Sequence, residues 1–161
     1  MKLTRSFVIY FLTFFLNAAF SFIVFSITSH YLNEKDLGVI YLYNASAILL
    51  VPFISIGTQF VLSVEFFRLQ VDKYRDYFSN GVMIPLITTV LFSVIFLLFY
   101  YPLQRFIPVN FFFAVTLPFS CFLIIMNEIF AALVRNKEKH IMFAIYSVAR
   151  NLLEIAATIL L

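Results

Sequence analysis

The sequence has no tryptophan, a single cysteine, three glycines and few charged residues. Charged residues make up 12% of the 161 residues, whereas hydrophobic residues make up 63%, and the mean hydropathy is +1.01. A soluble domain is about 25% charged and about 45–50% apolar. In water this chain would expose far more apolar surface than a solvated monomer carries. The composition therefore excludes a water-soluble globular domain and predicts an integral membrane protein.

The residues that carry catalysis or bind metals are also scarce. Cys121 lies alone in an apolar run, which excludes a disulfide framework and a thiolate metal site. His30 and His140 have no partners at metal-ligand spacing. No nucleophile with its base, phosphate loop or carboxylate dyad is recognisable, so we expect no enzyme activity, no cofactor and no metal. The net charge is +3, but the basic residues are distributed over separate loops. They do not form the continuous basic patch that a nucleic-acid-binding surface needs.

Long apolar runs dominate what remains. A membrane-spanning helix needs about 20 residues to cross a hydrocarbon core of roughly 30 Å, and five runs are long enough. They cover about 6–29, 37–64, 80–101, 111–134 and 141–161. None shows the alternation of polar and apolar residues that is typical of barrel strands. The sequence predicts an all-α, polytopic membrane protein with about five transmembrane helices.

The basic residues between the runs predict the orientation. Eight of the ten basic residues outside the runs lie on the side of the N-terminus, and two lie on the other side. Lys and Arg are enriched in cytoplasmic loops. We therefore expect the N-terminus to be cytoplasmic. The last run is still apolar where the chain stops, so we expect the chain to be the N-terminal part of a longer protein.

The segment 31–38 is a tight polar turn between the first two runs. Asn33 is a candidate N-cap, and Asp36 stands three residues later, where a capping box places an acidic residue. This pattern predicts that one helix ends near Tyr31 and that the next begins at Glu34. A turn this short makes the two helices antiparallel neighbours.

Two further segments are unusual. Pro52 and Gly57 lie inside the second run, where they predict either a packing kink or a bend that borders a cavity. In residues 66–79, aromatic and apolar residues recur at helical spacing on one face, and charged residues lie towards the other face. This pattern predicts a short cytoplasmic, amphipathic connector that lies in the plane of the interface.

Three ionisable residues lie inside spans, namely Glu128, Arg150 and Glu154. Burying a charge in lipid costs about 2.5–3.5 kcal/mol, so each is a candidate functional residue. Helical rise places Glu128 and Arg150 at similar depth, and Glu154 follows Arg150 on the same helix face. Two interpretations stay open. The three residues form a self-neutralising cluster that fixes helix packing, or Arg150 faces a water-filled cavity and attracts an anionic substrate.

The other polar residues in or beside the spans have simpler expected roles. Glu65 and Arg68 are either boundary charges that extend to the interface or cavity-lining residues. Four uncharged residues are expected to form interhelical hydrogen bonds of about 1 kcal/mol each, or to line a cavity. They are Asn17, Asn44, Gln59 and Asn127.

A resemblance to a known family rests mainly on residues 30–80. Four features of this region follow one another along the chain. They are the turn Leu32–Gly38, Gly57 near the end of the second run, the stretch Phe66–Arg68 and the charged segment Val71–Ser79. This order resembles the N-terminal part of the Wzx-like oligosaccharide flippases of polysaccharide biosynthesis. Those proteins belong to the MATE-like multidrug/oligosaccharidyl-lipid/polysaccharide exporter superfamily. The turn departs from the family pattern, because it lacks the usual proline and has Asn33 where serine is usual.

The resemblance implies a fold of about twelve to fourteen helices, of which this chain is an incomplete N-terminal bundle. It also implies a multi-pass protein of the bacterial inner membrane. Its activity is to flip undecaprenyl-pyrophosphate-linked oligosaccharide units by alternating access, for the synthesis of O-antigen, capsule or exopolysaccharide. Arg150 is then the cavity cation that engages the pyrophosphate. The implied partners are the lipid bilayer, the lipid-linked glycan, and a polysaccharide polymerase with its chain-length machinery.

Two alternatives remain open. A cation-coupled multidrug exporter of the same superfamily needs a carboxylate in its cavity, for which Glu128 and Glu154 are the candidates. A membrane polysaccharide polymerase or ligase is less favoured, because such enzymes usually carry a large outward loop and the outward turns here are short.

Overall fold

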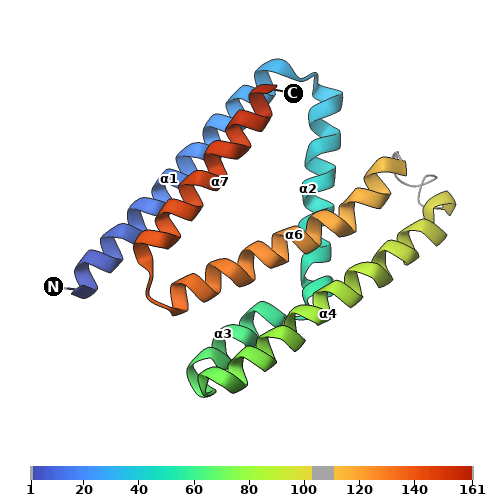
Figure 1. The fold of residues 1–161 in the computed structure, drawn as a ribbon. Coiled ribbons are helices and arrows are strands. Elements are labelled where there is room, and N and C mark those ends of the chain that lie inside the picture. Colours follow the sequence, from blue (N-terminus) through green and yellow to red (C-terminus); the bar gives the residue numbers. More distant parts are fainter. Residues whose placement is uncertain (1, 103–110, 161) are drawn as a thin grey trace. The chain divides into compact units, whose positions relative to one another are not determined.

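The computed structural model describes residues 2–102 and 111–160. These residues contain six numbered helices and no strand, which confirms the all-α prediction. The helices are α1 (Lys2–Tyr31), α2 (Glu34–Ser55), α3 (Thr58–Arg68), α4 (Val71–Leu98), α6 (Phe111–Asn136) and α7 (His140–Leu160) (Figure 1).

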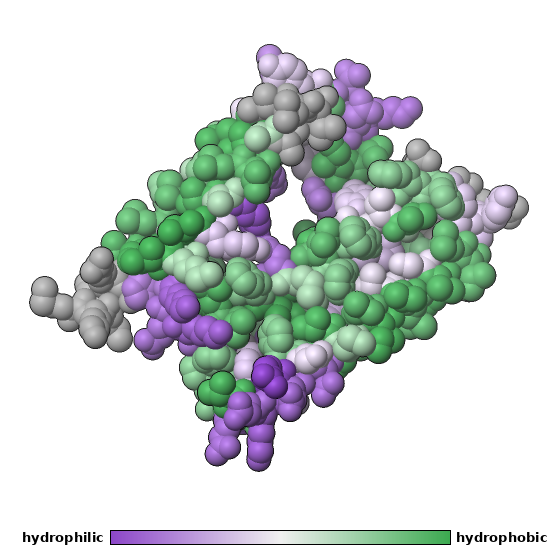
Figure 2. Space-filling view, viewed as in Figure 1, coloured by the Kyte–Doolittle hydropathy of each residue, from purple (hydrophilic) through white to green (hydrophobic). Residues whose placement is uncertain are grey.

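Four of the helices have the length and composition of membrane spans. They are α1 from Phe7 to Tyr31, α2, α4 and α6. Hydrophobic residues cover most of the face shown in Figure 2, and hydrophilic residues gather in a few groups. Large apolar side chains such as Phe22, Ile48 and Phe112 are about 70% exposed, a surface that suits lipid and not water. Together these features indicate a membrane protein.

The turn between the first two helices lies where the sequence predicts it. Helix α1 ends at Tyr31 and α2 begins at Glu34. The backbone N–H of Leu37 donates to the carbonyl oxygen of Asn33 at 3.0 Å, which closes the first turn of α2. Glu34 and Asp36 lie in that turn, where negative charge is favourable beside the positive end of the helix dipole.

The second run differs from the prediction of one helix over 37–64. The structure divides it into α2 and α3, which are separated by Ile56 and Gly57. Both residues have left-handed backbone conformations, with φ of 48° at Ile56 and 71° at Gly57. Glycine adopts this conformation without a steric cost, and a left-handed residue commonly ends a helix.

Proline alone does not explain this break. Pro52 lies three residues before the end of α2, but Pro85 and Pro118 lie inside the unbroken helices α4 and α6. The backbone at Ile56 and Gly57 is therefore the direct cause. A β-branched residue with positive φ is rare and strained, so the surrounding structure must hold Ile56 in this conformation.

The predicted connector 66–79 is not a separate element in the structure. Its first residues end α3 and its last residues begin α4, which continues without interruption to Leu98. The two helices pack against each other as a hairpin, joined through Leu69 and Gln70. The phenol of Tyr74 donates to the carbonyl oxygen of Leu62 at 3.3 Å, and the rings of Phe66 and Tyr74 pack edge to face. The amphipathic segment is thus the first part of a long helix.

The chain forms two compact units. One comprises Tyr41–Leu133, and the other joins the first 40 residues to those from Val134 onward. The core of the first unit consists of Ala47, Ile54, Leu62, Leu117, Cys121, Ile125 and Ile129. Hydroxyl groups link its helices at the edge of this core, since Tyr43 hydrogen-bonds Ser120 at 2.5 Å. In the second unit α1 packs against α7.

The two glycines Gly38 and Gly57 provide a matched test of the break. We expect Gly57→Ala to lower the free energy of unfolding by about 1–2 kcal/mol, because alanine strains the left-handed backbone. Gly38 lies within α2 with open space where a Cβ would stand. Gly38→Ala is therefore expected to raise the free energy of unfolding by about 0.5–1 kcal/mol. Unfolding in mixed detergent micelles, followed by circular dichroism, measures both values. Stabilisation by both substitutions would contradict a left-handed Gly57.

Candidate functional site

Helices α1 and α7 lie side by side and run in the same direction (Figure 1). The ring of Phe143 packs against Tyr10 and Phe14, with centroid separations of 5.5 and 6.4 Å. Further along both helices, Asn17 contacts Ser147 and Asn151. The contacts advance together along the two helices, so the packing is parallel.

Three polar side chains meet at the centre of this pair, and we call them the Asn17 cluster: Asn17, Ser147 and Asn151. The Asn17 Nδ2 donates to the Ser147 Oγ at 2.7 Å. The Asn17 Oδ1 lies 3.0 Å from the Ser147 Oγ and accepts from the Asn151 Nδ2 at 2.7 Å. Ser147 and Asn151 are only 7% and 5% exposed. Both polar atoms of the Asn17 amide are therefore used in joining α1 to α7.

The cluster lies close to the middle of a candidate membrane span. The span in α1 covers Phe7–Tyr31, whose middle residue is number 19. Asn17 is two residues away, which is about 3 Å along the helix axis. Because Ser147 and Asn151 contact Asn17 directly, the centre of α7 lies at the same depth.

The polar residues of α7 form one stripe. At 3.6 residues per turn, Ser147, Arg150, Asn151 and Glu154 fall within a sector of about 100°. One edge of the stripe is buried against α1 in the Asn17 cluster, whereas Arg150 and Glu154 are exposed. An arginine at this depth costs about 2.5–3.5 kcal/mol if it faces lipid. Arg150 therefore requires water, a polar partner or a substrate, and this edge of α7 is the candidate functional site.

The remaining predicted charges belong to α6 and α3. Glu128 is exposed on α6 and belongs to the other compact unit, so its predicted cluster with Arg150 and Glu154 stays a prediction. Glu65 and Arg68 form an ion pair one turn apart at the end of α3, with 3.6 Å between the carboxylate and the guanidinium. The Arg68 side chain is 72% exposed, which fits a boundary charge.

The other uncharged polar residues differ in their surroundings. Asn44 is exposed on α2, and Asn127 is half-buried on α6. Gln59, near the start of α3, has a buried Oε1 atom for which the described residues supply no hydrogen-bond partner. Of the four residues, Asn17 makes hydrogen bonds between two helices within its unit.

Sequence reasoning missed Ser147 and Asn151. The sequence signal that could have found them is their spacing of four residues on α7, because this spacing puts both on one face. It also missed the hydroxyl contact of Tyr43 with Ser120 in the other unit. Serine and tyrosine are too common in membrane helices for either to be recognised without knowledge of which helices are neighbours.

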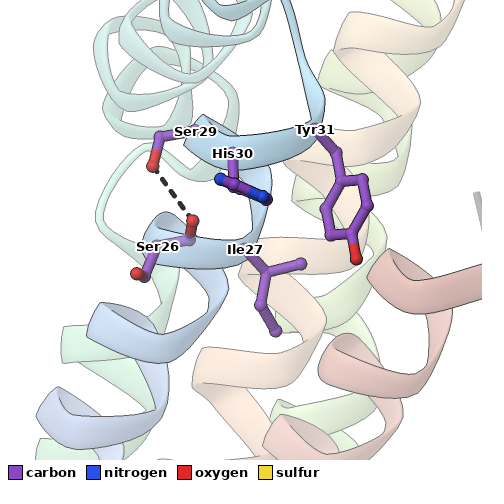
Figure 3. Close-up of a pocket in the computed structure, with 5 residues that line it drawn as sticks. All are labelled: Ser26, Ile27, Ser29, His30 and Tyr31. Atoms are coloured by element: carbon purple, nitrogen blue, oxygen red, sulfur yellow. Dashed lines mark hydrogen bonds between the residues drawn. The ribbon is translucent and has the colours of Figure 1, made fainter.

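A shallow surface hollow lies at the end of α1. It encloses about 440 Å³ and is lined by Ser26, Ile27, Ser29, His30 and Tyr31 (Figure 3). The Ser29 hydroxyl donates to the Ser26 carbonyl oxygen at 3.0 Å, so its hydrogen atom is already used in a bond within α1. Across the described part of the chain, no group of three His, Cys, Asp or Glu side chains is placed to hold a metal ion.

Comparison with models of known protein families, with curated proteins and with solved structures finds no match.

The Asn17 cluster gives a prediction about stability. We expect Asn17→Leu to lower the free energy of unfolding by about 1–2 kcal/mol, because interhelical hydrogen bonds in membranes are worth roughly 0.6–1.7 kcal/mol each and two partners lose theirs. Asn44→Leu, at an exposed position on α2, is the matched control and should have little effect. Unfolding in detergent micelles tests both variants. A double-mutant cycle of Asn17→Ala with Asn151→Ala should show coupling, and strictly additive losses would contradict the direct hydrogen bond.

Proposed function

We propose that this protein is a membrane transporter that moves a lipid-linked, anionic oligosaccharide across the membrane by alternating access. The substrate we favour is an undecaprenyl-pyrophosphate-linked unit of a bacterial surface polysaccharide. The observation that carries the proposal is the exposed Arg150 on α7, beside the Asn17 cluster, whose Asn17 lies near the middle of the candidate span in α1.

The chemistry of this position supports an anionic substrate. Transporters bind substrate near the midplane of the bilayer. Charged side chains are rare at this depth because burying a charge in lipid is costly. The guanidinium of Arg150 presents a planar set of donors that matches two phosphate oxygens at once. The hydrogen bonds of the Asn17 cluster fix α7 against α1 and so fix the direction in which the neighbouring Arg150 points.

Glu154 supports a second candidate, the export of a cationic drug coupled to an ion. It lies one turn from Arg150 on the same stripe of α7 and is exposed. A carboxylate near the midplane can carry a proton or attract a cation. The two candidates make opposite predictions for Arg150 and Glu154, because each assigns substrate binding to a different one of them.

We expect Arg150→Ala to abolish transport of a pyrophosphate-linked glycan and Arg150→Lys to retain part of it, because lysine keeps the charge but loses the bidentate geometry. The measurement is the appearance of surface polysaccharide in cells that depend on the protein, together with its abundance in the membrane. Lys137→Ala, an exposed position between α6 and α7, is the control and should behave as wild type.

Full surface polysaccharide in Arg150→Ala cells would remove Arg150 from the mechanism. The exporter would be favoured if cells lacking the protein make normal surface polysaccharide but are sensitive to drugs. Glu154→Gln cells should then show the same drug sensitivity.

A further inference from the structure

A groove lies between α3 and α4, within one compact unit of the chain. It encloses about 190 Å³ and is more enclosed than the hollow at the end of α1. Its walls are mostly hydrocarbon, from Ile56, Val61, Leu62 and Ile84. The interior therefore offers little to a sugar or to water, both of which lose hydrogen bonds on entering an apolar cavity.

The close approach of the two helices shapes one wall of the groove. A Cβ at Gly81 would stand 2.8 Å from a methyl group of Leu62, so any larger residue there would displace the Leu62 side chain. The break at Ile56 and Gly57 starts α3 beside the groove, and Ile56 itself contributes to the lining. The groove thus depends on two features that the packing of ordinary helices does not need.

Polar groups are confined to part of the lining. Thr58, Tyr77 and Asn80 contribute to it, and Tyr77 and Asn80 are exposed. On α4, Lys73 lies one turn before Tyr77, and positions 73, 77, 80, 81 and 84 share one stripe at the spacing of a helix. The stripe therefore passes from a cation near the hairpin turn to an apolar wall further along α4.

Two exposed cations lie near the hairpin turn. Lys73 is exposed, and Arg68 is exposed at the end of α3. The nearest carboxylate on α3, that of Glu65, is already paired with Arg68. Asp72 and Asp76 lie near Lys73 on α4, but within the described part of the chain neither carboxylate forms an ion pair with Lys73. The ammonium of Lys73 thus has its three donors available to a phosphate oxygen.

We propose that this groove binds one phospholipid with an anionic headgroup, independently of the proposed transport function. An acyl chain lies along Val61, Leu62 and Ile84, and the phosphate contacts Lys73. The apolar walls select hydrocarbon, and the cation selects an anionic headgroup, such as that of phosphatidylglycerol, over the zwitterionic headgroup of phosphatidylcholine.

The test is photo-crosslinking of the full chain in nanodiscs with phosphatidylglycerol that carries a diazirine in its acyl chain. Labelled peptides are identified by mass spectrometry. We expect labels concentrated on α3 and the first half of α4. Val61→Trp fills the groove and should lower this labelling at least fivefold. Val64→Trp is the matched control, because Val61 and Val64 are 47% and 50% exposed on the same helix and only Val61 lines the groove.

The headgroup is tested with exposed residues whose substitution does not disturb packing. Lys73→Glu should reduce labelling by phosphatidylglycerol several-fold, whereas Arg75→Glu, on the opposite side of α4, should leave it unchanged. Unlabelled phosphatidylglycerol should compete better than phosphatidylcholine. Labelling that is unchanged by Val61→Trp, in protein whose helix content equals that of wild type, would overturn the groove. Equal competition by the two lipids would overturn the headgroup assignment.

Discussion

Hydrocarbon offers no hydrogen-bond partner, so every polar group that enters the membrane must find one within the protein. The hydroxyl side chains of this chain follow that rule locally. Thr13, Thr28, Ser46 and Ser93 each donate to the carbonyl oxygen four residues earlier in their own helix, at 2.6–2.8 Å. An asparagine has two polar atoms in its side chain. Asn17 finds hydrogen-bond partners for both atoms on α7. The need for a partner thus keeps the hydroxyls bonded within their own helices, whereas for Asn17 it joins two helices.

The break between α2 and α3 meets the same constraint with side chains. The Gly57 N–H donates to the Ser55 Oγ at 3.3 Å, and the Thr58 Oγ1 donates to the Ser55 carbonyl oxygen. From α4, the Thr88 hydroxyl donates to the carbonyl oxygen of Ile54 at 2.5 Å. Hydroxyls thus bind the backbone groups that an unbroken helix would pair internally. Such a break is a stable part of the fold, because it is supplied with the partners that lipid does not provide.

The sequence predicts those features that depend on neighbouring residues. The end of α1 at Tyr31 and the start of α2 at Glu34 follow from local capping residues, and the long helices follow from the apolar runs. Pro52 and Gly57 predicted a kink or a bend in the second run, but not the complete break at Ile56 and Gly57, because an isolated glycine in an apolar run is compatible with a continuous helix. The partners of Asn17 were not predictable either, since they lie on a helix that is distant in sequence. Periodicity identifies a polar face but not the helix that it meets.

The hydrogen bond between Asn17 and Ser147 joins residues that are 130 positions apart. A ribosome that adds about 5–20 residues per second makes the second partner roughly 7–26 s after the first. During this interval α1 is already synthesised, and its amide has no α7 to bind. The insertion machinery, water at the interface or an earlier helix must shelter that amide until α7 arrives. Helix α1 thus completes its packing only after α7 has been made, and biogenesis has to tolerate a polar side chain without its partner in the membrane until then.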